Sequence, residues 1–195
     1  MKSFNIAAYI SGSGSNLKCV IENSLQGIIA SKVKLVIADK NASGLDYPAS
    51  LGIETAIISR NELSRAEFLD TQSDLLKKHK IDLIILAGFL KKLPDEIVQL
   101  YKGRILNIHP ALLPKFSGKG MHGMNVHRAV VDAKEKFSGP TVHFVDEIYD
   151  NGDILLQRKI KLNQDETPES LQKRVLEIEH KIYSEAIKLL EEREK

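Results

Sequence analysis

The sequence predicts an α/β domain built on a mostly parallel, doubly wound sheet. Short apolar segments alternate with longer segments of helical periodicity along most of the chain. The short segments are apolar almost throughout, as expected for parallel strands that helices cover on both faces. A length of 195 residues, with 43% hydrophobic and 28% charged residues, suits one folded domain and argues against disorder.

The expected elements follow from runs of apolar residues and from helical spacing. The strands are residues 4–10, 33–38, 55–59, 82–87, 104–108 and 140–146, followed by a longer, alternating and half-exposed strand at 154–162. The helices between the early strands are at about 15–30, 45–51, 61–79 and 94–101. A last helix, about 168–192, begins with Thr167 as its N-cap and Pro168 at its first position. Residues 115–126 are polar and rich in Gly and Met, which predicts a long surface loop.

The composition excludes several classes of protein. Lys and Arg number 28 and Asp and Glu 26, so the net charge of +2 gives no general reason to bind nucleic acid or an anionic membrane. Cys19 is the only cysteine, which excludes a disulfide framework and a Cys-rich metal site. The longest strongly apolar stretch, residues 83–90, is too short to span a bilayer, and the N-terminus lacks the pattern of a signal peptide. We therefore expect a soluble, cytoplasmic protein.

A first candidate site lies between the first expected strand and the first expected helix. It consists of Gly12, Ser13, Gly14, Ser15 and Asn16. Glycines allow a close approach of the backbone to a ligand, and the N–H groups at the start of a helix attract a phosphate. The third glycine of a dinucleotide-binding motif and the Lys of a P-loop are both missing. The alternative is a simple turn in which Ser15 or Asn16 caps the helix.

A second candidate site lies at the end of the strand expected at 104–108. Asn107 and His109 are two positions apart, so both side chains point to one side before Pro110 ends the strand. An amide donor beside an imidazole predicts an oxyanion site with a proton donor. The alternative is a His that only hydrogen-bonds with the backbone.

A third candidate site is the dense acidic turn at residues 146–153. A solvated hairpin loop is the ordinary explanation of such a run. Its position at a strand end favours a function, because one of its carboxylates would lie close to His109. That carboxylate would raise the pKa of the imidazole and keep it protonated near neutral pH.

Two weaker features concern isolated residues. His109, His122 and His127 match no familiar metal-binding spacing, so no metal is expected. Glu179 falls on or beside the apolar face of the last helix, and a boundary Glu that extends to solvent is the simple explanation.

Four motifs occur together in a specific order: SGSGSN at residues 11–16, LAGF at 86–89, NIHP followed by LLP within 107–114, and DNG at 150–152. In these motifs the chain resembles the phosphoribosylglycinamide formyltransferases, folate-dependent enzymes of purine biosynthesis. The resemblance runs from residue 4 to about 183. It implies a Rossmann-like, mostly parallel fold and a single formyltransferase domain over residues 1–195.

The resemblance also implies a role for each matching residue. The substrate-binding residues would be those of the phosphate loop and one acid on the last helix: Gly12, Ser13, Gly14, Ser15, Asn16 and Glu179. The residues that line the folate pocket would be Arg65, Leu90, Lys91, Lys92, Leu93, Asn107, Asp146 and Asp150. The catalytic residues would be Asn107, His109 and Asp150.

The implied reaction transfers a formyl group from 10-formyltetrahydrofolate, the cosubstrate, to the amine of 5-phosphoribosylglycinamide, without a metal. Asn107 and a protonated His109 would stabilise the oxyanion, and Asp150 would keep His109 charged. The implied partners are these small molecules, with no nucleic acid and no membrane. The chain would be a monomer or a homodimer.

Some positions depart from the family, and alternatives exist. Ser13 replaces a common Asn, Lys91 replaces a frequent Arg, and residues 115–126 look longer than in compact members. For that reason His122 and His127 receive no role. Methionyl-tRNA formyltransferase shares the Asn-x-His core but adds a C-terminal domain, and formyltetrahydrofolate hydrolase usually adds an N-terminal one. A third alternative is a folate-binding module without activity, which the intact catalytic set disfavours.

Overall fold

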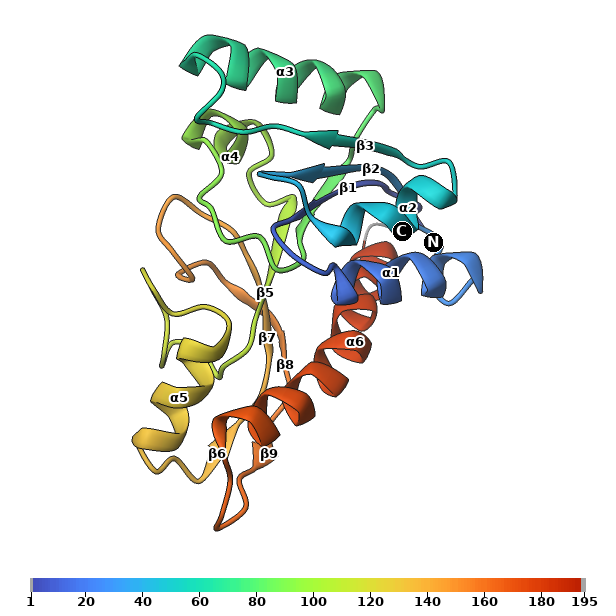
Figure 1. Ribbon diagram of the computed structural model, residues 1–195. Coiled ribbons are helices and arrows are strands. Elements are labelled where there is room, and N and C mark those ends of the chain that lie inside the picture. The colour runs from blue at the N-terminus through green and yellow to red at the C-terminus, as the bar shows by residue number, and fades with distance from the viewer. Residues whose placement is uncertain (1, 194–195) are drawn as a thin grey trace.

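The computed structural model describes residues 2–193 and contains a seven-stranded sheet with the order β3-β2-β1-β4-β5-β7-β8 (Figure 1). The parallel strands are β1 Asn5–Ile10, β2 Lys32–Ala38, β3 Glu54–Ile57, β4 Leu83–Leu86 and β5 Ile105–His109. Two antiparallel strands, β7 Thr141–Phe144 and β8 Ile154–Gln157, complete one edge. The predicted fold class, a mostly parallel α/β sheet, is confirmed.

Helices cover both faces of the sheet, because the parallel strands are apolar on both sides. On one face, α1 (Ser15–Leu25) and the long helix α6 (Pro168–Arg193) bury residues such as Leu17 and Ile182 (Figure 1). On the other face, α3 (Arg65–Lys78) and α4 (Asp95–Leu100) bury residues such as Leu76 and Ile97. The remaining helical segments are a 3₁₀ turn at Ser43–Leu45, α2 at Asp46–Ser50 and α5 at Met124–Asp132.

The first and last helices show how local sequence sets their ends. The backbone N–H of Ser170 donates to Thr167 Oγ1 at 3.1 Å, so Thr167 caps α6 and Pro168 is its first residue, as predicted. Helix α1 ends at Leu25, five residues earlier than predicted. Gly27 has φ +72°, a left-handed conformation that terminates a helix and that glycine adopts without strain.

The region after β5 differs from the prediction in two ways. The loop was expected to extend to residue 126, but it ends at Gly123. Helix α5, nine residues long, begins at Met124 and was not predicted from the sequence. Val130 of α5 is buried with Leu171 and Val175 of α6, so tertiary packing stabilises a helix too short to form alone. The strand expected at 154–162 divides into β8 and β9 (Ile160–Lys161), and β9 pairs with β6 (Phe137–Ser138).

The strand order places a site at one edge of the sheet. After β1 the chain forms β2 and β3 on one side, and then returns to form β4 and β5 on the other. This reversal beside β1 is a topological switch point, where ligands bind beyond the carboxyl ends of parallel strands. Two of the candidate sites, residues 12–16 after β1 and Asn107 with His109 at the end of β5, lie at this edge. The acidic turn at 146–153 follows the antiparallel strand β7, whose last residue, Phe144, pairs with Leu106.

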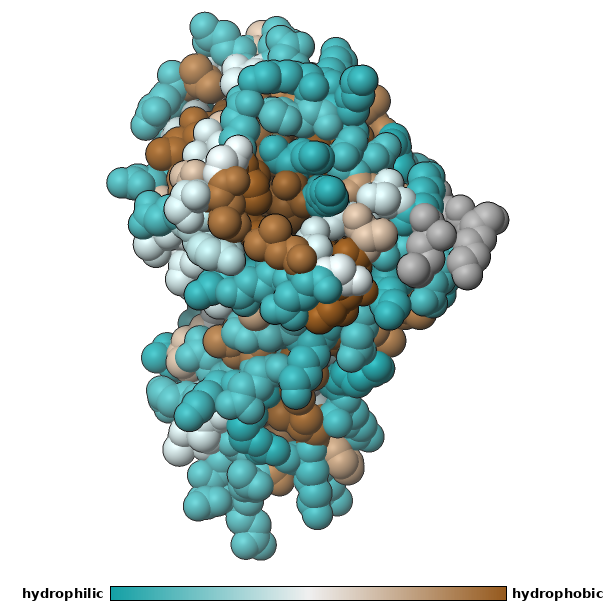
Figure 2. All heavy atoms as spheres, turned by 90° about the vertical axis from the view of Figure 1, so that its right-hand side faces the viewer, coloured by the Kyte–Doolittle hydropathy of each residue, from teal (hydrophilic) through white to brown (hydrophobic). Residues whose placement is uncertain are grey.

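On the face shown in Figure 2, hydrophilic residues predominate and the largest apolar patch lies in the upper half. None of the helices between residues 2 and 193 is both long enough and apolar enough to cross a membrane.

Candidate active site

A cavity of about 540 Å³ lies at the predicted edge of the sheet. Its walls come from the segment after β4 (88–93), the hairpin between β7 and β8 (145–150), the loop at 118–123, and α6. Asn107, His109 and Asp150 all line it, so the structure brings the predicted catalytic residues together.

Asn107 and His109 reach the cavity from β5, two positions apart as predicted. The Nδ2 group of Asn107 donates to His143 Nε2 at 3.0 Å and to Asp150 Oδ1 at 3.4 Å. His143 pairs with Asn107 across the antiparallel ladder between β5 and β7. Its Nδ1–H donates to the Phe144 carbonyl at 2.8 Å, which leaves Nε2 as the acceptor for Asn107. The sequence analysis missed His143.

Asp150 occupies the tip of the hairpin with φ +53°, a strained conformation for a residue other than glycine. Its Oδ2 accepts a hydrogen bond from the Gly118 N–H at 3.0 Å and lies 3.7 Å from His109 Nδ1. Burial raises the pKa of this carboxyl, but His143, His109 and the Gly118 N–H outweigh burial and hold the pKa below its usual value. Asp150 is therefore charged at neutral pH.

Gly152 explains why a glycine follows Asp150 in the DNG motif. A Cβ atom at Gly152 would lie 2.0 Å from the carbonyl oxygen of Phe144 on the facing strand. Glycine alone lets the hairpin close at this point, and the closed hairpin holds Asp150 against β5.

The protonation of His109 differs from the prediction. Burial lowers its pKa, and neither the charge of Asp150 nor the hydrogen bond to the Phe116 carbonyl restores the usual value. The expectation that Asp150 keeps His109 charged in the free protein is therefore wrong, because desolvation is larger than the attraction across 3.7 Å. The Phe116 carbonyl, 2.8 Å from Nε2, requires a proton on Nε2, so Nδ1 of the neutral ring faces Asp150.

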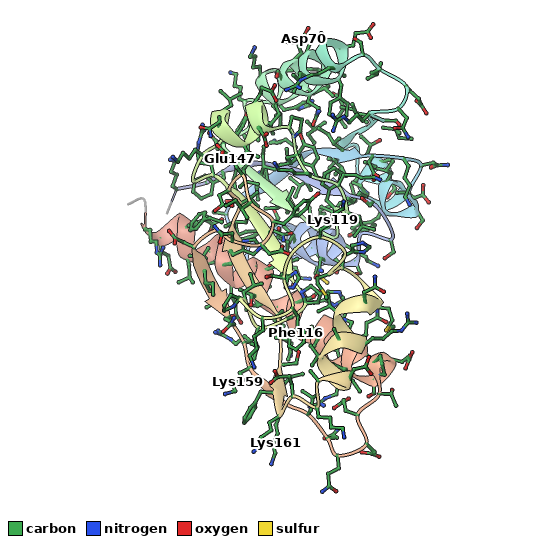
Figure 3. The ribbon with its side chains drawn as sticks, turned by 90° about the vertical axis from the view of Figure 1, so that its left-hand side faces the viewer. Asp70, Phe116, Lys119, Glu147, Lys159 and Lys161 are labelled. Atoms are coloured by element: carbon green, nitrogen blue, oxygen red, sulfur yellow. The ribbon has the colours of Figure 1, made fainter. Side chains whose placement is uncertain are left out.

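The loop at 115–123 is tied to the catalytic residues through its backbone. The Phe116 carbonyl accepts from His109, and the Gly118 N–H donates to Asp150. In Figure 3 the loop with Phe116 and Lys119 runs across the middle of the molecule, between the hairpin that carries Glu147 and the lower lobe with Lys159 and Lys161.

The glycine-rich loop has the geometry of an anion site. Gly14 is the N-cap of α1 with φ +67°, and no side chain caps the helix, so the alternative of a Ser15 or Asn16 cap is wrong. The first N–H groups of α1 have no partner within the helix. Gly12 and Ser13 are exposed, and nothing lies within 4 Å of a Cβ built on Gly12.

Gly44, which the sequence analysis missed, supports this loop from the 3₁₀ turn after β2. Its N–H donates to the Gly12 carbonyl at 3.1 Å. A Cβ on Gly44 would lie 2.7 Å from that same oxygen and 2.9 Å from Gly14 N. Two backbone segments thus pack directly on each other, and any larger residue at position 44 would move the loop.

Asn16 and Glu179 form a buried pair at the cavity wall. Asn16 Nδ2 donates to Glu179 Oε2 at 2.7 Å, and Asn16 Oδ1 has no hydrogen-bond partner among residues 2–193. Burial raises the pKa of Glu179 to about 7, although the Asn16 hydrogen bond opposes this. The acid on the apolar face of α6 is therefore no surface residue, and a polar ligand would satisfy both side chains.

The predicted folate residues divide into two groups. Leu90, Lys91, Lys92, Leu93, Asp146 and Asp150 line the cavity. Arg65 does not: it pairs with Glu96 at 2.6 Å, its side chain is 74% exposed, and it lines a smaller neighbouring hollow of about 240 Å³ that shares Lys92 and Leu93. Ser11, the first residue of the SGSGSN motif, connects the glycine-rich loop to the segment after β4, because its Oγ accepts from the Leu90 N–H at 2.9 Å.

Asp146 orders the hairpin from within. Its Oδ1 accepts from the Ile148 N–H at 2.8 Å and its Oδ2 from Asn151 Nδ2 at 3.0 Å. In residues 2–193 no three His, Cys, Asp or Glu side chains are grouped so that they could hold a metal ion.

Comparisons with known proteins show the family to which the chain belongs. The family model described as formyl transferase matches residues 4–187. The chain is 42% identical over 185 residues to the chloroplastic phosphoribosylglycinamide formyltransferase of Arabidopsis thaliana, a match that covers 93% of the chain and 63% of that relative. It is 38% identical over 185 residues to the phosphoribosylglycinamide formyltransferase of Haemophilus influenzae, covering 94% of the chain and 85% of the relative.

A solved structure, glycinamide ribonucleotide transformylase 1 from Symbiobacterium toebii, superposes with a TM-score of 0.89 at 34% identity. That match covers 97% of the chain and 88% of the solved one. The chain spans less than two thirds of the length of the Arabidopsis relative.

Proposed function

This chain belongs to the formyl transferase family, and from that premise we propose that it transfers a formyl group from 10-formyltetrahydrofolate to the amine of 5-phosphoribosylglycinamide. The products are N-formylglycinamide ribonucleotide and tetrahydrofolate, in the synthesis of purines. The observation that carries the proposal is the convergence of Asn107, His109 and Asp150 in one cavity between two different walls. The names of the most similar relatives support the choice of substrates.

One wall suits the folate. Leu86, Leu90, Val98, Val145 and Ile148 line this part of the cavity and offer apolar surface to a flat ring system. Lys91 and Lys92 at the same wall provide cations for the carboxylates of the folate tail. When bound, the folate supplies an activated one-carbon unit and a nitrogen leaving group.

The other wall suits the nucleotide. The N–H groups at the start of α1 and the hydroxyls of Ser13 and Ser15 are the donors for its phosphate. Asn16, the last residue of this loop, and Glu179 line the cavity together with the catalytic residues and would contact the ribose. The nucleotide amine then lies beside Asn107 and His109.

The chemistry follows from these donors. As the amine nitrogen bonds to the formyl carbon, negative charge develops on the formyl oxygen, and Asn107 Nδ2 donates to it in place of its long 3.4 Å contact with Asp150. The Nε2–H of His109, given to the Phe116 carbonyl in the free protein, donates to the same oxygen. Each such donor is worth about 3–4 kcal/mol of barrier.

Asp150 transfers the proton that leaves the substrate amine. The carbon–nitrogen bond to the folate breaks, and one proton moves from the amine to the folate nitrogen. Because the pKa of Asp150 is lowered, its carboxylate is ionised and accepts that proton, directly or through a water, before returning it.

An absorbance assay for tetrahydrofolate tests the proposal, with and without the nucleotide. We expect product only when 5-phosphoribosylglycinamide is present. Equal rates without it would support the hydrolase alternative, and folate binding without turnover would support a binding module. The proposal also includes a cytoplasmic location and a monomer or homodimer, which cell fractionation and analytical ultracentrifugation measure.

A further inference from the structure

His127 is a buried histidine of α5 that the proposed mechanism does not use. Its exposed fraction is 3%, and it lines the cavity that contains His109. Its Nδ1 atom is fully buried and has no hydrogen-bond partner in residues 2–193. Nε2 has no hydrogen-bond partner in residues 2–193 either, but it is not fully buried, so it is the ring nitrogen that a ligand in the cavity can reach.

The other two buried histidines of the site differ from His127 in their partners. His109 donates to the Phe116 carbonyl and faces Asp150 with its other nitrogen. His143 donates to the Phe144 carbonyl and accepts from Asn107. Most polar side chains buried in native proteins have partners, so an imidazole that lines a cavity with Nε2 unpartnered indicates a group that the ligand supplies to Nε2.

The position of His127 indicates which ligand supplies that group. It belongs to α5, which packs against α6, and Gln172 and Glu179 of α6 line the same cavity. Burial and the neighbouring His109 lower the pKa of His127 to about 4, so the ring is uncharged at neutral pH. An uncharged imidazole is suited to an amide or hydroxyl group, whereas the start of α1 is suited to a phosphate.

We propose that His127 is a substrate-binding residue whose Nε2 atom hydrogen-bonds with an uncharged amide or hydroxyl group of the nucleotide substrate. The inference rests on the proposed function for the identity of that nucleotide. The bond would fix the nucleotide beside His109 and so align its amine with the formyl carbon.

Two variants of His127 and one control test this role. His127→Leu removes the polar ring and keeps an apolar side chain, and His127→Gln keeps a hydrogen-bonding group. Val130→Ala is the control, because Val130 is buried on the same helix but does not line the cavity. The measurements are the KM for 5-phosphoribosylglycinamide, the KM for the folate, and the melting temperature.

We expect His127→Leu to raise the nucleotide KM about tenfold and to change the folate KM by less than about twofold. Its melting temperature should equal or exceed that of the wild type, because an unpaired buried nitrogen is removed. His127→Gln should have a nucleotide KM between those of the wild type and of His127→Leu. Val130→Ala should lower the melting temperature and leave both KM values unchanged.

An unchanged nucleotide KM in His127→Leu would overturn the inference. So would an equal rise in both KM values together with a lower melting temperature, since that result describes a structural residue. If the wild type fails to transfer the formyl group at all, the proposed function fails instead. Calorimetric binding of the same nucleotide to the wild type and to His127→Leu then decides the role of His127 separately, and equal affinities would overturn it.

Discussion

The glycine-rich loop and the catalytic residues lie at the same edge of the sheet but are built in different ways. The loop is local: five consecutive residues between β1 and α1 supply its donors, with Gly44 as the external support. The catalytic set is assembled from β5, the hairpin between β7 and β8, and the loop at 115–123. Properties of the loop can therefore be predicted from sequence, whereas those of the catalytic set depend on burial and on distant partners.

The protonation of His109 shows this difference most clearly. The carboxylate predicted near the ring is present, 3.7 Å away, but the pKa of His109 is lowered and not raised as predicted. The attraction of Asp150 acts in the predicted direction, but the depth at which His109 is buried decides the result. Burial is a property of the assembled fold that neighbouring residues in the chain do not show.

The largest effect is expected from His109→Ala. The variant loses a donor to the formyl oxygen, so kcat should fall about 100-fold or more. Folding and folate affinity should change little, because the loss is in the transition state. Steady-state kinetics with a folate-binding titration measure both quantities, and an unchanged kcat would remove His109 from the mechanism.

A smaller loss of turnover is expected from Asp150→Asn, about 10-fold to 100-fold, because the proton acceptor is lost. Asn tolerates the left-handed conformation that Asp150 adopts, so the hairpin should persist. The charge of Asp150 raises the pKa of His109, so this pKa should fall further in the variant. The part of the pH–rate profile that reports the titration of His109 should then move to lower pH. A profile of unchanged position would contradict the coupling of the two residues.

Two variants, one at each glycine of the glycine-rich loop, separate loss of the phosphate site from loss of stability. Gly14→Val and Gly12→Val should both raise the nucleotide KM far more than the folate KM, by about tenfold or more. Only Gly14→Val should also lower the melting temperature, because Gly14 has φ +67° and its Cβ would lie 3.1 Å from Gly44, whereas the space around Gly12 is open. Equal losses for both substrates in Gly12→Val would indicate misfolding instead of a lost phosphate site.

The smallest effect is expected from Glu179→Gln on the stability of the free protein. The raised pKa means that between pH 4.5 and about 7 the folded wild type binds a proton that the unfolded chain does not. This contribution to wild-type stability is therefore lost as the pH rises through that range. Gln does not titrate, so the variant does not lose this stability as the pH rises. The melting temperature of the variant minus that of the wild type should therefore be higher at pH 8 than at pH 5. Parallel pH curves would show that Glu179 titrates normally.

Much of the fold and part of the site could be predicted from the sequence. The apolar strands and the Thr167 and Pro168 helix start are local signals, and they were predicted correctly. Helix α5 was missed because its stability depends on packing of Val130 against α6. His143 was missed because its pairing with Asn107 across the sheet joins residues that are far apart in the chain.

Arg65 shows the limit of transferring a role by resemblance. Its position matches the family, but its exposed side chain pairs with Glu96 and lines the neighbouring hollow, so its contact with the folate stays a prediction. The pairing partner belongs to α4, 31 positions away, and no local pattern around Arg65 indicates it.

The transfer of a labelled carbon tests the central claim most directly. The wild-type protein is incubated with 10-formyltetrahydrofolate carrying ¹³C in the formyl group and with 5-phosphoribosylglycinamide, and the products are identified by mass spectrometry. The account predicts that the label appears in the formylated nucleotide in proportion to the tetrahydrofolate released. Label recovered as formate, at a rate that does not depend on the nucleotide, would contradict it.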